Sequence, residues 1–311
     1  MILPSLSGAR TRGALRSLGV QSTAHETIVV DNGSPGREVS AACEEFGFAR
    51  AIRSEANLGF SRAVNLAAGE AAGHALVLVN DDASYDPEFV ERLVAALDPE
   101  AGVVAGAGVL RSEDDERLID SAGVEIDRTL LGFDYLHGRP LETLSDGTPD
   151  PFGPTGAAAA YDRDAFATLG GFDERIFAYF VDVDLALRMR LAGWTCRLAP
   201  GARGTHAHAA TLGSGSRRKN YLMGFARGYL LRKWGVVSAG RASGVALREA
   251  VICSAQALVD RNLAGVRGRR EGWRSASRGA YPAAVVEAGA TLGLVDGLTR
   301  RYGRLARRRA R

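Results

Sequence analysis

The chain has 311 residues, of which 46% are hydrophobic and 24% are charged. This length allows one large domain or two modest ones, and the composition is that of a soluble globular protein rather than a disordered or fibrous one. The three cysteines, Cys43, Cys196 and Cys253, are far apart and form no CxxC pair, which argues against a disulfide framework or a zinc site and favours a reducing cytosol.

Charge is distributed unevenly along the chain. Residues 241–311 hold 15 Arg and 5 Asp or Glu, a net charge of +10, whereas the first 240 residues hold 24 Lys or Arg and 31 Asp or Glu, a net charge of −7. The tail, RRYGRLARRRAR, is either a solvated terminus or a segment attracted to an anionic membrane surface or another polyanion.

No signal peptide is visible in the sequence. No uncharged stretch approaches the roughly 20 residues that span a bilayer. The best candidate, residues 242–260, is interrupted by Arg248 and Glu249. We therefore expect a cytoplasmic protein, with a peripheral contact to the inner face of the membrane through the basic carboxyl terminus and with no nucleic-acid partner.

Over the first 110 residues, short apolar runs alternate with helical patterns. MILPSLSG indicates a short first strand, either truncated or continued upstream; the other predicted elements are strands at 27–30, 75–79 and 102–110 and helices near 10–20, 36–47, 60–72 and 86–97. Asp86 is the expected cap of the last helix, with Pro87 at its first position. The alternation predicts an α/β fold in which a mostly parallel, Rossmann-like central sheet has helices on both faces.

The rest of the chain is less regular. Residues 111–155 are polar and rich in Gly, Pro and Asp, which indicates a long loop or a small irregular insertion of the kind that usually has a function. Strands are expected at 156–160 and within TCRLAPGARGTHAHA, and helices at about 181–192, 217–234 and 244–265.

Two adjacent carboxylates, Asp81 and Asp82, follow the apolar run ALVLV directly. Such a pair is costly to bury because the charges repel each other. A divalent cation such as Mg²⁺ or Mn²⁺ resolves the repulsion and usually binds through one or two carboxylates and the phosphates of a substrate. The alternative is a solvated turn, in which Asp is common. In parallel sheets, ligands bind beyond the carboxyl ends of the strands, where both this pair and Asp31 lie.

An ordered set of motifs surrounds this pair: ETIVVDNGS upstream, RSEANLGFSRAVN before it, and GGFDE, DVDLALR and PGARGTH downstream. Over residues 2–235 this set resembles family 2 glycosyltransferases of the GT-A fold, especially the rhamnosyltransferase and galactofuranosyltransferase branch. The resemblance implies a glycosyltransferase domain over 1–235, with a nucleotide-sugar-binding half (1–110) and an acceptor-binding, catalytic half (111–235). A basic helical extension would follow over 236–311.

The resemblance also implies a role for individual positions. Asp182 matches the catalytic base, and Asp82 matches the metal ligand of the DxD-type motif, with His206 completing the metal or diphosphate site. The positions expected along the nucleotide sugar are Pro4, Ser5, Asp31, Asn57, Gly59, Phe60, Asn65 and Asp81. Asp81 is expected to serve the ribose or to support the site from behind.

The chemistry of these residue types agrees with glycosyl transfer. A metal offsets the charge that builds on the leaving diphosphate, and a base takes the proton of the acceptor hydroxyl. At the start of a helix, Asp182 should be kept ionised by the helix dipole. Asp184 lies two residues further on and should point to another side, so a single base implies one displacement with inversion.

The donor and the acceptor are left open by the sequence. dTDP-rhamnose, favoured by the branch, and UDP- or GDP-sugars are candidate donors, and the acceptor implied is a glycan or lipid-linked glycan of the cell wall or cell surface. Val181 stands where the family has Glu. Together with the short first strand, that departure supports an alternative, a catalytically impaired nucleotide-sugar-binding homologue that acts as a partner subunit in glycan assembly. A Rossmann-type oxidoreductase or nucleotidyltransferase is disfavoured, because no GxGxxG follows the first strand.

Overall fold

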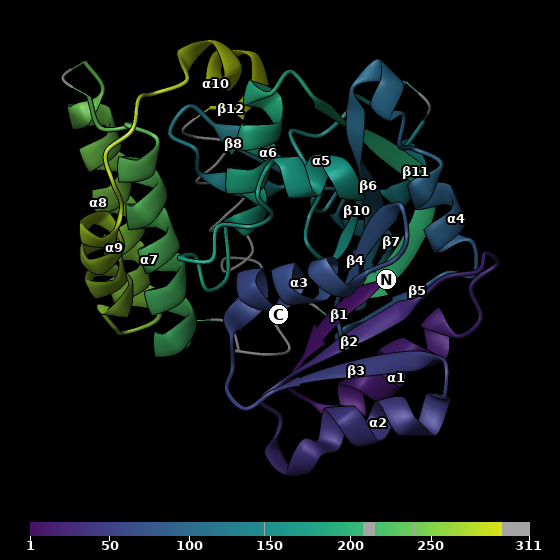
Figure 1. Cartoon of the computed structure of the whole chain (residues 1–311). Coiled ribbons are helices and arrows are strands. Elements are labelled where there is room, and N and C mark those ends of the chain that lie inside the picture. Colours follow the sequence, from purple (N-terminus) through teal and green to yellow (C-terminus); the bar gives the residue numbers. More distant parts are fainter. Residues whose placement is uncertain (146, 208–214, 239, 294–311) are drawn as a thin grey trace. The chain divides into compact units, whose positions relative to one another are not determined.

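The computed structural model describes residues 1–145, 147–207, 215–238 and 240–293 (Figure 1). The chain forms two compact units. Unit 1 comprises Met1–Val124 and Asp134–Thr211, and unit 2 comprises Glu125–Phe133 and Leu212–Arg311. His208 and the basic segment 300–311 lie outside the described residues.

Unit 1 contains most of the strands. Its elements are β1 Ile2–Ser5, α1 Gly8–Leu18, β2 Thr27–Asn32, η1 Pro35–Arg37, α2 Glu38–Phe46, β3 Ala49–Ser54, α3 Gly59–Glu70, β4 Ala75–Val79, β5 Ala83–Tyr85, α4 Phe89–Val94, η2 Pro99–Ala101, β6 Val103–Ser112, β7 Asp115–Ser121, η3 Leu141–Thr143, β10 Ala158–Asp162, α5 Arg163–Thr168, α6 Val181–Leu191 and β11 Thr195–His206. Two strands cross the boundary between the units, β8 Val124–Asp127 and β9 Gly132–Asp134.

The sheet of unit 1 has the strand order β3-β2-β1-β4-β10-β6-β11-β5, with β7 beside β6. Strands β3, β2, β1 and β4 are parallel, as are β6 and β11, whereas β10 is antiparallel to both β4 and β6. The predicted α/β fold is therefore confirmed. The sheet is mixed rather than mostly parallel, because β10, β5 and β7 pair with their neighbours in the antiparallel direction. Because β1, β2 and β4 are parallel, their carboxyl ends meet at one edge, and Ser5 is the register partner of Asp31.

Strand residues alternate between the two faces of this sheet. Leu3, Val29 and Val77 belong to one core cluster that includes side chains from α1, α2 and α4. Their strand neighbours Ile2 and Ile28 are equally buried but point to the other face. Helices α1 and α2 lie on one side of β1–β3 and α3 lies on the other (Figure 1). The helices on both faces bury β1, β2 and β4 almost completely and leave the ends of these strands available for a site.

Local differences from the sequence prediction have clear causes. The helix expected at 86–97 is the shorter α4, with Glu88 at its N-cap position. Asp86 does not cap it, because its carboxylate pairs with Arg111 of β6. The irregular insertion expected over 111–155 contains strands β7, β8 and β9, and β3 and β5 were also not predicted.

Unit 2 is mainly helical, and its elements are α7 Arg217–Lys233, α8 Ala242–Val259, α9 Ala264–Ser275, α10 Ala283–Gly289 and β12 Ala290–Leu292. The sequence predicted a single helix over 244–265, where the structure has α8 and then the start of α9. β12 pairs with β8, and β8 with β9, in a small second sheet. Helix α7 belongs to unit 2 rather than to the unit that holds the first strands.

Glycines let α7 and α9 pack with their backbones almost in contact. A Cβ added at Gly228 of α7 would overlap the carbonyl oxygen of Arg269, and one added at Gly272 of α9 would overlap that of Phe225. Small residues spaced in this way allow two helices to approach more closely than larger side chains permit.

We predict that Gly272→Ala lowers the free energy of unfolding by about 1 to 3 kcal/mol, because the added methyl group overpacks the α7–α9 contact. Urea denaturation followed by circular dichroism measures the change. Gly244→Ala in α8 is the matched control: no atom lies within 4 Å of its added Cβ. It should stabilise the protein by up to about 1 kcal/mol. Equal effects of the two substitutions would contradict the proposed close packing.

Candidate active site

Ser5, at the end of β1, fixes one of the two adjacent carboxylates. Its hydroxyl donates to Asp81 and accepts a hydrogen bond from the Thr11 hydroxyl at 2.9 Å. Burial raises the pKa of Asp81; the Ser5 hydrogen bond opposes this rise, and the charge of Asp82 adds to it. Pro4, the residue before Ser5, is half-buried on the same strand, beside Val30 of β2. The Asp81 carboxylate is thus held against the end of β1.

Asp82 faces the other way, toward His206 at the end of β11. The short strand β5 pairs with β11 so that Ala83 is the register partner of His206, and the Ala207 N–H donates to the Asp82 carbonyl at 2.9 Å. The pairing places the Asp82 Oδ1 and His206 Nε2 atoms 3.3 Å apart. The turn before it is anchored by Tyr85, whose hydroxyl accepts from the Asn80 N–H and donates to the Ala157 carbonyl.

Asp120 of β7 holds the opposite edge of the same imidazole. Its Oδ2 atom lies 2.8 Å from His206 Nδ1, and its side chain is only 4% exposed. Burial lowers the pKa of His206, but hydrogen bonds to Asp120 and Asp82 outweigh burial and raise this pKa to about 10. In this structure the imidazolium therefore bridges two carboxylates.

The carboxylate of Asp31 is enclosed at the end of β2. It accepts hydrogen bonds from the Ser34 N–H, the Ser40 hydroxyl and the Arg53 guanidinium, at 2.6 to 2.9 Å. Burial works against ionisation, yet these donors lower the pKa of Asp31 to about 2. Asp31 therefore braces the loop between β2 and α2, and its role toward a nucleotide stays a prediction.

The predicted NxGF…N residues organise the start of α3. The Asn57 Oδ1 atom accepts from the Gly59 N–H at 2.9 Å, and Gly59 has a φ of 80° with the Phe177 carbonyl where a Cβ would stand. Phe60 packs on Phe172. Asn65 exchanges hydrogen bonds with the Phe172 backbone, both at 2.9 Å, and so ties α3 to the GGFDE turn.

Asp182 lies in the first turn of α6, as predicted. Its Oδ1 atom accepts from the Val183 N–H at 2.9 Å, and the Gly156 backbone provides a further hydrogen bond. Desolvation outweighs these donors and raises the pKa of Asp182 to about 6, so that the start of a helix does not lower this pKa as the sequence suggested. The carboxylate remains largely ionised at pH 7, with a basicity well suited to accepting a proton.

The neighbouring carboxylate, Asp184, has a different environment. It is fully buried and accepts a hydrogen bond from Arg188 Nε at 2.9 Å, so it points away from Asp182 as the helical spacing predicts. Tyr179, just before α6, is close enough to Asp82 for that charge to add to the effect of burial and raise the pKa of Tyr179 to about 12. The loop that leads to Asp182 therefore lies within electrostatic reach of Asp82.

The donor atoms at this edge fit a divalent cation. Asp82 Oδ1 and His206 Nε2 face each other, and the far nitrogen of the imidazole is held by a buried carboxylate, an arrangement that orients metal-binding histidines. The described residues contain no group of three or more His, Cys, Asp or Glu side chains placed to hold a metal ion. A cation there would therefore need phosphate or water oxygens to complete its coordination.

Sequence reasoning missed two contributors to this edge, Asp120 and Arg53. Asp120 was overlooked because its strand was taken for part of a loop; the apolar pair Leu118–Ile119 just before it is the signal that could have revealed a strand. Nothing in the local sequence indicates that Arg53 contacts Asp31, since the two meet through the β2–β3 register.

Residues 8–170 match the model of glycosyl transferase family 2. The chain belongs to this family and is a glycosyltransferase. It is 30% identical over 210 residues to an N-acetylglucosaminyl-diphospho-decaprenol L-rhamnosyltransferase of Mycobacterium tuberculosis, covering 60% of this chain and 67% of the relative. It is also 31% identical over 183 residues to the O-antigen biosynthesis protein RfbC of Myxococcus xanthus, covering 54% of this chain and 14% of that protein. These relatives confirm the resemblance to the rhamnosyltransferase branch.

Solved glycosyltransferase structures share the fold. A mannosyltransferase of Pyrobaculum calidifontis, solved with GDP-Man and Mn²⁺, aligns with a TM-score of 0.55 and 17% identity over 92% of this chain and 77% of its own. GalNAc-T7, solved with UDP, GalNAc and Mn²⁺, aligns with a TM-score of 0.60 and 14% identity over 89% of this chain and 54% of its own. These similarities confirm the GT-A fold.

We predict that Asp182→Asn stabilises the folded protein at pH 7. The unfolded chain releases this proton near pH 3.8 and the folded protein near pH 6, so the wild type loses stability as the pH rises between these values. The variant avoids this loss, which is on the order of 2 to 3 kcal/mol. Melting temperatures from pH 4 to pH 8 should show the gain above pH 6 and little of it at pH 4.

Asp184→Asn is the matched control for this experiment. It leaves half-buried Arg188 without its carboxylate partner and should lower the melting temperature. A melting temperature for Asp182→Asn that stays below that of the wild type at pH 7 would contradict the account of Asp182.

Proposed function

We propose that this glycosyltransferase is metal-dependent and inverting, and that it moves a sugar, with rhamnose favoured, from a nucleotide diphosphate to a lipid-linked glycan. The observation that carries the proposal is the pairing of β5 with β11, which brings Asp82 within 3.3 Å of His206 at the carboxyl edge of the sheet. A buried carboxylate and an oriented imidazole at this edge are suited to a cation that also binds a diphosphate.

The residues of the chain divide the reaction between them. Asp182 takes the proton of the acceptor hydroxyl as that oxygen bonds to the anomeric carbon. The bond from this carbon to the diphosphate breaks on the opposite face, so the configuration inverts. Asp184 is held by Arg188 and is not available as a nucleophile for a double displacement.

The cation would be held by Asp82 and by the neutral form of His206, because a cation at Nε2 displaces the proton that this nitrogen otherwise shares with Asp82. Asp120 would fix the imidazole from behind. Bound there, Mn²⁺ or Mg²⁺ supplies the positive charge that stabilises the leaving diphosphate. Ser5 keeps Asp81 turned toward β1, so that one carboxylate rather than two faces this position. Tyr179 stays protonated at physiological pH and lies within electrostatic reach of Asp82.

Donor and acceptor are proposed by analogy with relatives. The Mycobacterium tuberculosis relative is named as an L-rhamnosyltransferase acting on a decaprenol diphosphate, which favours a dTDP-rhamnose donor and a lipid-linked acceptor. The Myxococcus xanthus relative is named for O-antigen biosynthesis, which supports a role in surface polysaccharide assembly. UDP- and GDP-sugars stay as further candidates. Such substrates imply a cytoplasmic enzyme at the inner face of the membrane.

The central test uses two variants, one expected to lose sugar transfer and the other expected to lose metal-dependent donor binding. Asp182→Asn should reduce transfer by about 10²- to 10⁴-fold and keep Mn²⁺-dependent donor binding, because only the base is lost. Asp82→Ala should lose the metal-dependent part of donor binding. Radiolabelled sugar transfer measures the rate, and calorimetric titration with a panel of nucleotide sugars measures donor binding. The transfer rate of the wild type should decrease at pH values below about 6, where Asp182 becomes protonated. Full activity in both variants would refute the mechanism, and donor binding without turnover in the wild type would favour a non-catalytic partner subunit.

A third variant tests the support behind His206. Asp120→Asn should weaken Mn²⁺ binding by about 10- to 100-fold in the presence of a nucleoside diphosphate, because the imidazole loses its orienting carboxylate. Electron paramagnetic resonance of free Mn²⁺ gives the affinity without a transfer assay. Asp115→Asn, a half-buried position on the same strand whose carboxylate pairs with Arg117, is the control and should leave the affinity unchanged. Unchanged affinity in Asp120→Asn would exclude this role.

A further inference from the structure

Unit 2 exposes a helix face that carries no charge. By length and composition α8 is the one described helix that could cross a membrane, yet only 17% of its 18-residue span is buried. Its exposed residues are all apolar or small, and they are Ser243, Gly244, Ala246, Leu247, Ala250, Val251, Ser254 and Leu258. Leu247 and Leu258 are 62% and 80% exposed, and Leu263 and Val266, just after α8, are 66% and 44% exposed.

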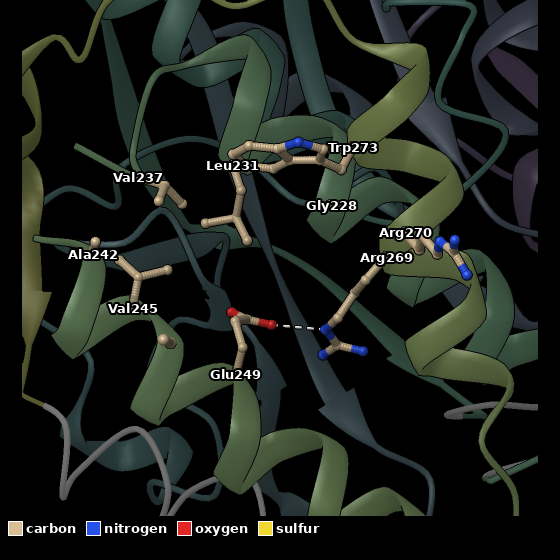
Figure 2. Close-up of a pocket in the computed structure, with 10 residues that line it drawn as sticks. Gly228, Leu231, Val237, Ala242, Val245, Glu249, Arg269, Arg270 and Trp273 are labelled. Atoms are coloured by element: carbon tan, nitrogen blue, oxygen red, sulfur yellow. Dashed lines mark hydrogen bonds and ion pairs between the residues drawn. The ribbon is translucent and has the colours of Figure 1, made fainter. Parts of the chain in front are cut away.

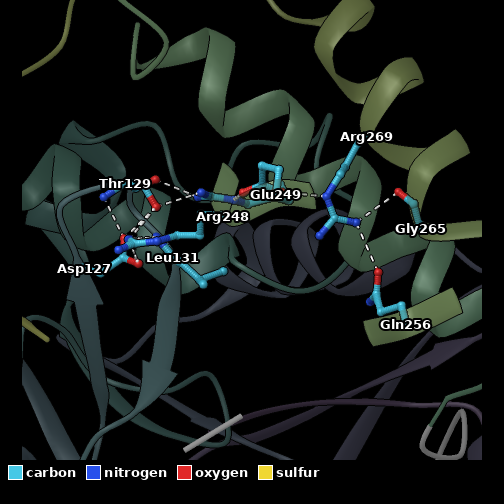
Figure 3. A network of polar contacts seen from close by, with 9 residues as sticks. Asp127, Thr129, Leu131, Arg248, Glu249, Gln256, Gly265 and Arg269 are labelled. Atoms are coloured by element: carbon cyan, nitrogen blue, oxygen red, sulfur yellow. Dashed lines mark hydrogen bonds and ion pairs between the residues drawn. The ribbon is translucent and has the colours of Figure 1, made fainter. Parts of the chain in front are cut away.

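The two charged residues of α8 point into unit 2. Glu249 accepts hydrogen bonds from Arg227 and Arg269, both at 2.7 Å, and Arg248 pairs with Asp127 (Figure 3). Arg227 itself is almost completely buried. These ion pairs fix the orientation of α8, so that its polar side is satisfied internally and its apolar side is left outward.

Exposed arginines lie along the neighbouring helix. Arg270 and Arg274 of α9 are exposed and spaced by one helical turn, and Arg261 lies in the α8–α9 connection. None of the three forms a salt bridge with any residue in the described part of the chain. Exposed basic residues next to exposed leucines are typical of segments that bind at the surface of an anionic membrane.

A pocket in unit 2 lies on the other side of α8 from the exposed leucines. It has a volume of about 350 Å³ and is lined by residues of α7, α8 and α9, among them Val245, Glu249 and Arg269 (Figure 2). On α9, the exposed residues Val266, Arg270 and Arg274 follow one another at intervals of four residues, so that apolar and basic side chains share one face of this helix.

We propose that this α8–α9 surface, formed by Leu247, Val251, Leu258, Arg261, Leu263, Val266, Arg270 and Arg274, docks on an anionic lipid bilayer. The leucines would enter the interfacial layer and the arginines would contact lipid phosphates. The surface lies on the membrane rather than spanning it, because α8 is tied through Glu249 to α9, whose exposed arginines cannot enter hydrocarbon. The inference rests on the membrane location proposed above.

Flotation of the full chain with vesicles tests this surface. The wild type should bind vesicles of phosphatidylcholine mixed with phosphatidylglycerol and bind far less to phosphatidylcholine alone. Leu258→Glu combined with Leu263→Glu should weaken binding roughly tenfold or more. Arg270→Gln combined with Arg274→Gln should weaken it by about fivefold per arginine.

Matched controls come from unit 1. Leu191→Glu changes another exposed leucine, and Arg16→Gln combined with Arg139→Gln removes two exposed arginines; none of these should alter flotation. Melting curves of each variant establish that it is folded. Because vesicle binding is read without a transfer assay, failure of the proposed chemistry would appear separately in that assay.

Three results would overturn the proposal. One is a wild type that does not bind the anionic vesicles. Another is binding that persists in both double variants, which would assign membrane attachment to a different part of the chain. The third is a stable dimer by light scattering that Leu258→Glu dissociates, which would make the surface an interface between two copies of this chain.

Discussion

Two adjacent carboxylates at the end of a buried strand repel each other, and the carboxyl edge of the sheet is arranged around this repulsion. Ser5 holds Asp81 from one side. His206 faces Asp82 from the other, and Asp120 in turn fixes His206. Strands β1, β4, β5, β7 and β11 each contribute one side chain or one backbone pairing to this arrangement. Elements from distant parts of unit 1 thus provide the hydrogen bonds and the opposite charge that stabilise the two carboxylates.

The same arrangement separates the two chemical tasks of a glycosyltransferase. In the proposed mechanism, the acidic edge at Asp82 attracts a cation and a diphosphate, whereas Asp182 lies in a drier environment that raises its pKa to about 6. Two carboxylates with different surroundings can therefore serve as a ligand and as a base in one site. The loop that contains Tyr179 leads directly into α6, which carries Asp182. The charge of Asp82 helps to raise the pKa of Tyr179, so this loop is within electrostatic reach of both carboxylates.

Local sequence predicts this edge only in part. The apolar run before Asp81, the helix that begins near Asp182 and the strand that ends at His206 were all predicted, because each is encoded by neighbouring residues. Asp120 and the three-residue strand β5 were missed, because they are defined by pairing with distant strands. Asp86 failed as a helix cap because Arg111, brought close by the sheet, takes its carboxylate. The raised pKa of Asp182 likewise arises from tertiary burial, which overrides the local helix dipole.

In unit 2, too, charged side chains held by distant partners fix the position of an element. Ion pairs of Glu249 with Arg227 and Arg269 orient α8 with its apolar side outward. The central claim, however, concerns unit 1. The most direct measurement is anomalous scattering from crystals grown with Mn²⁺ and dTDP. The account predicts a manganese peak between the Asp82 carboxylate and His206 Nε2, with the diphosphate completing the coordination. Bound nucleotide without a manganese peak at these two side chains would contradict it.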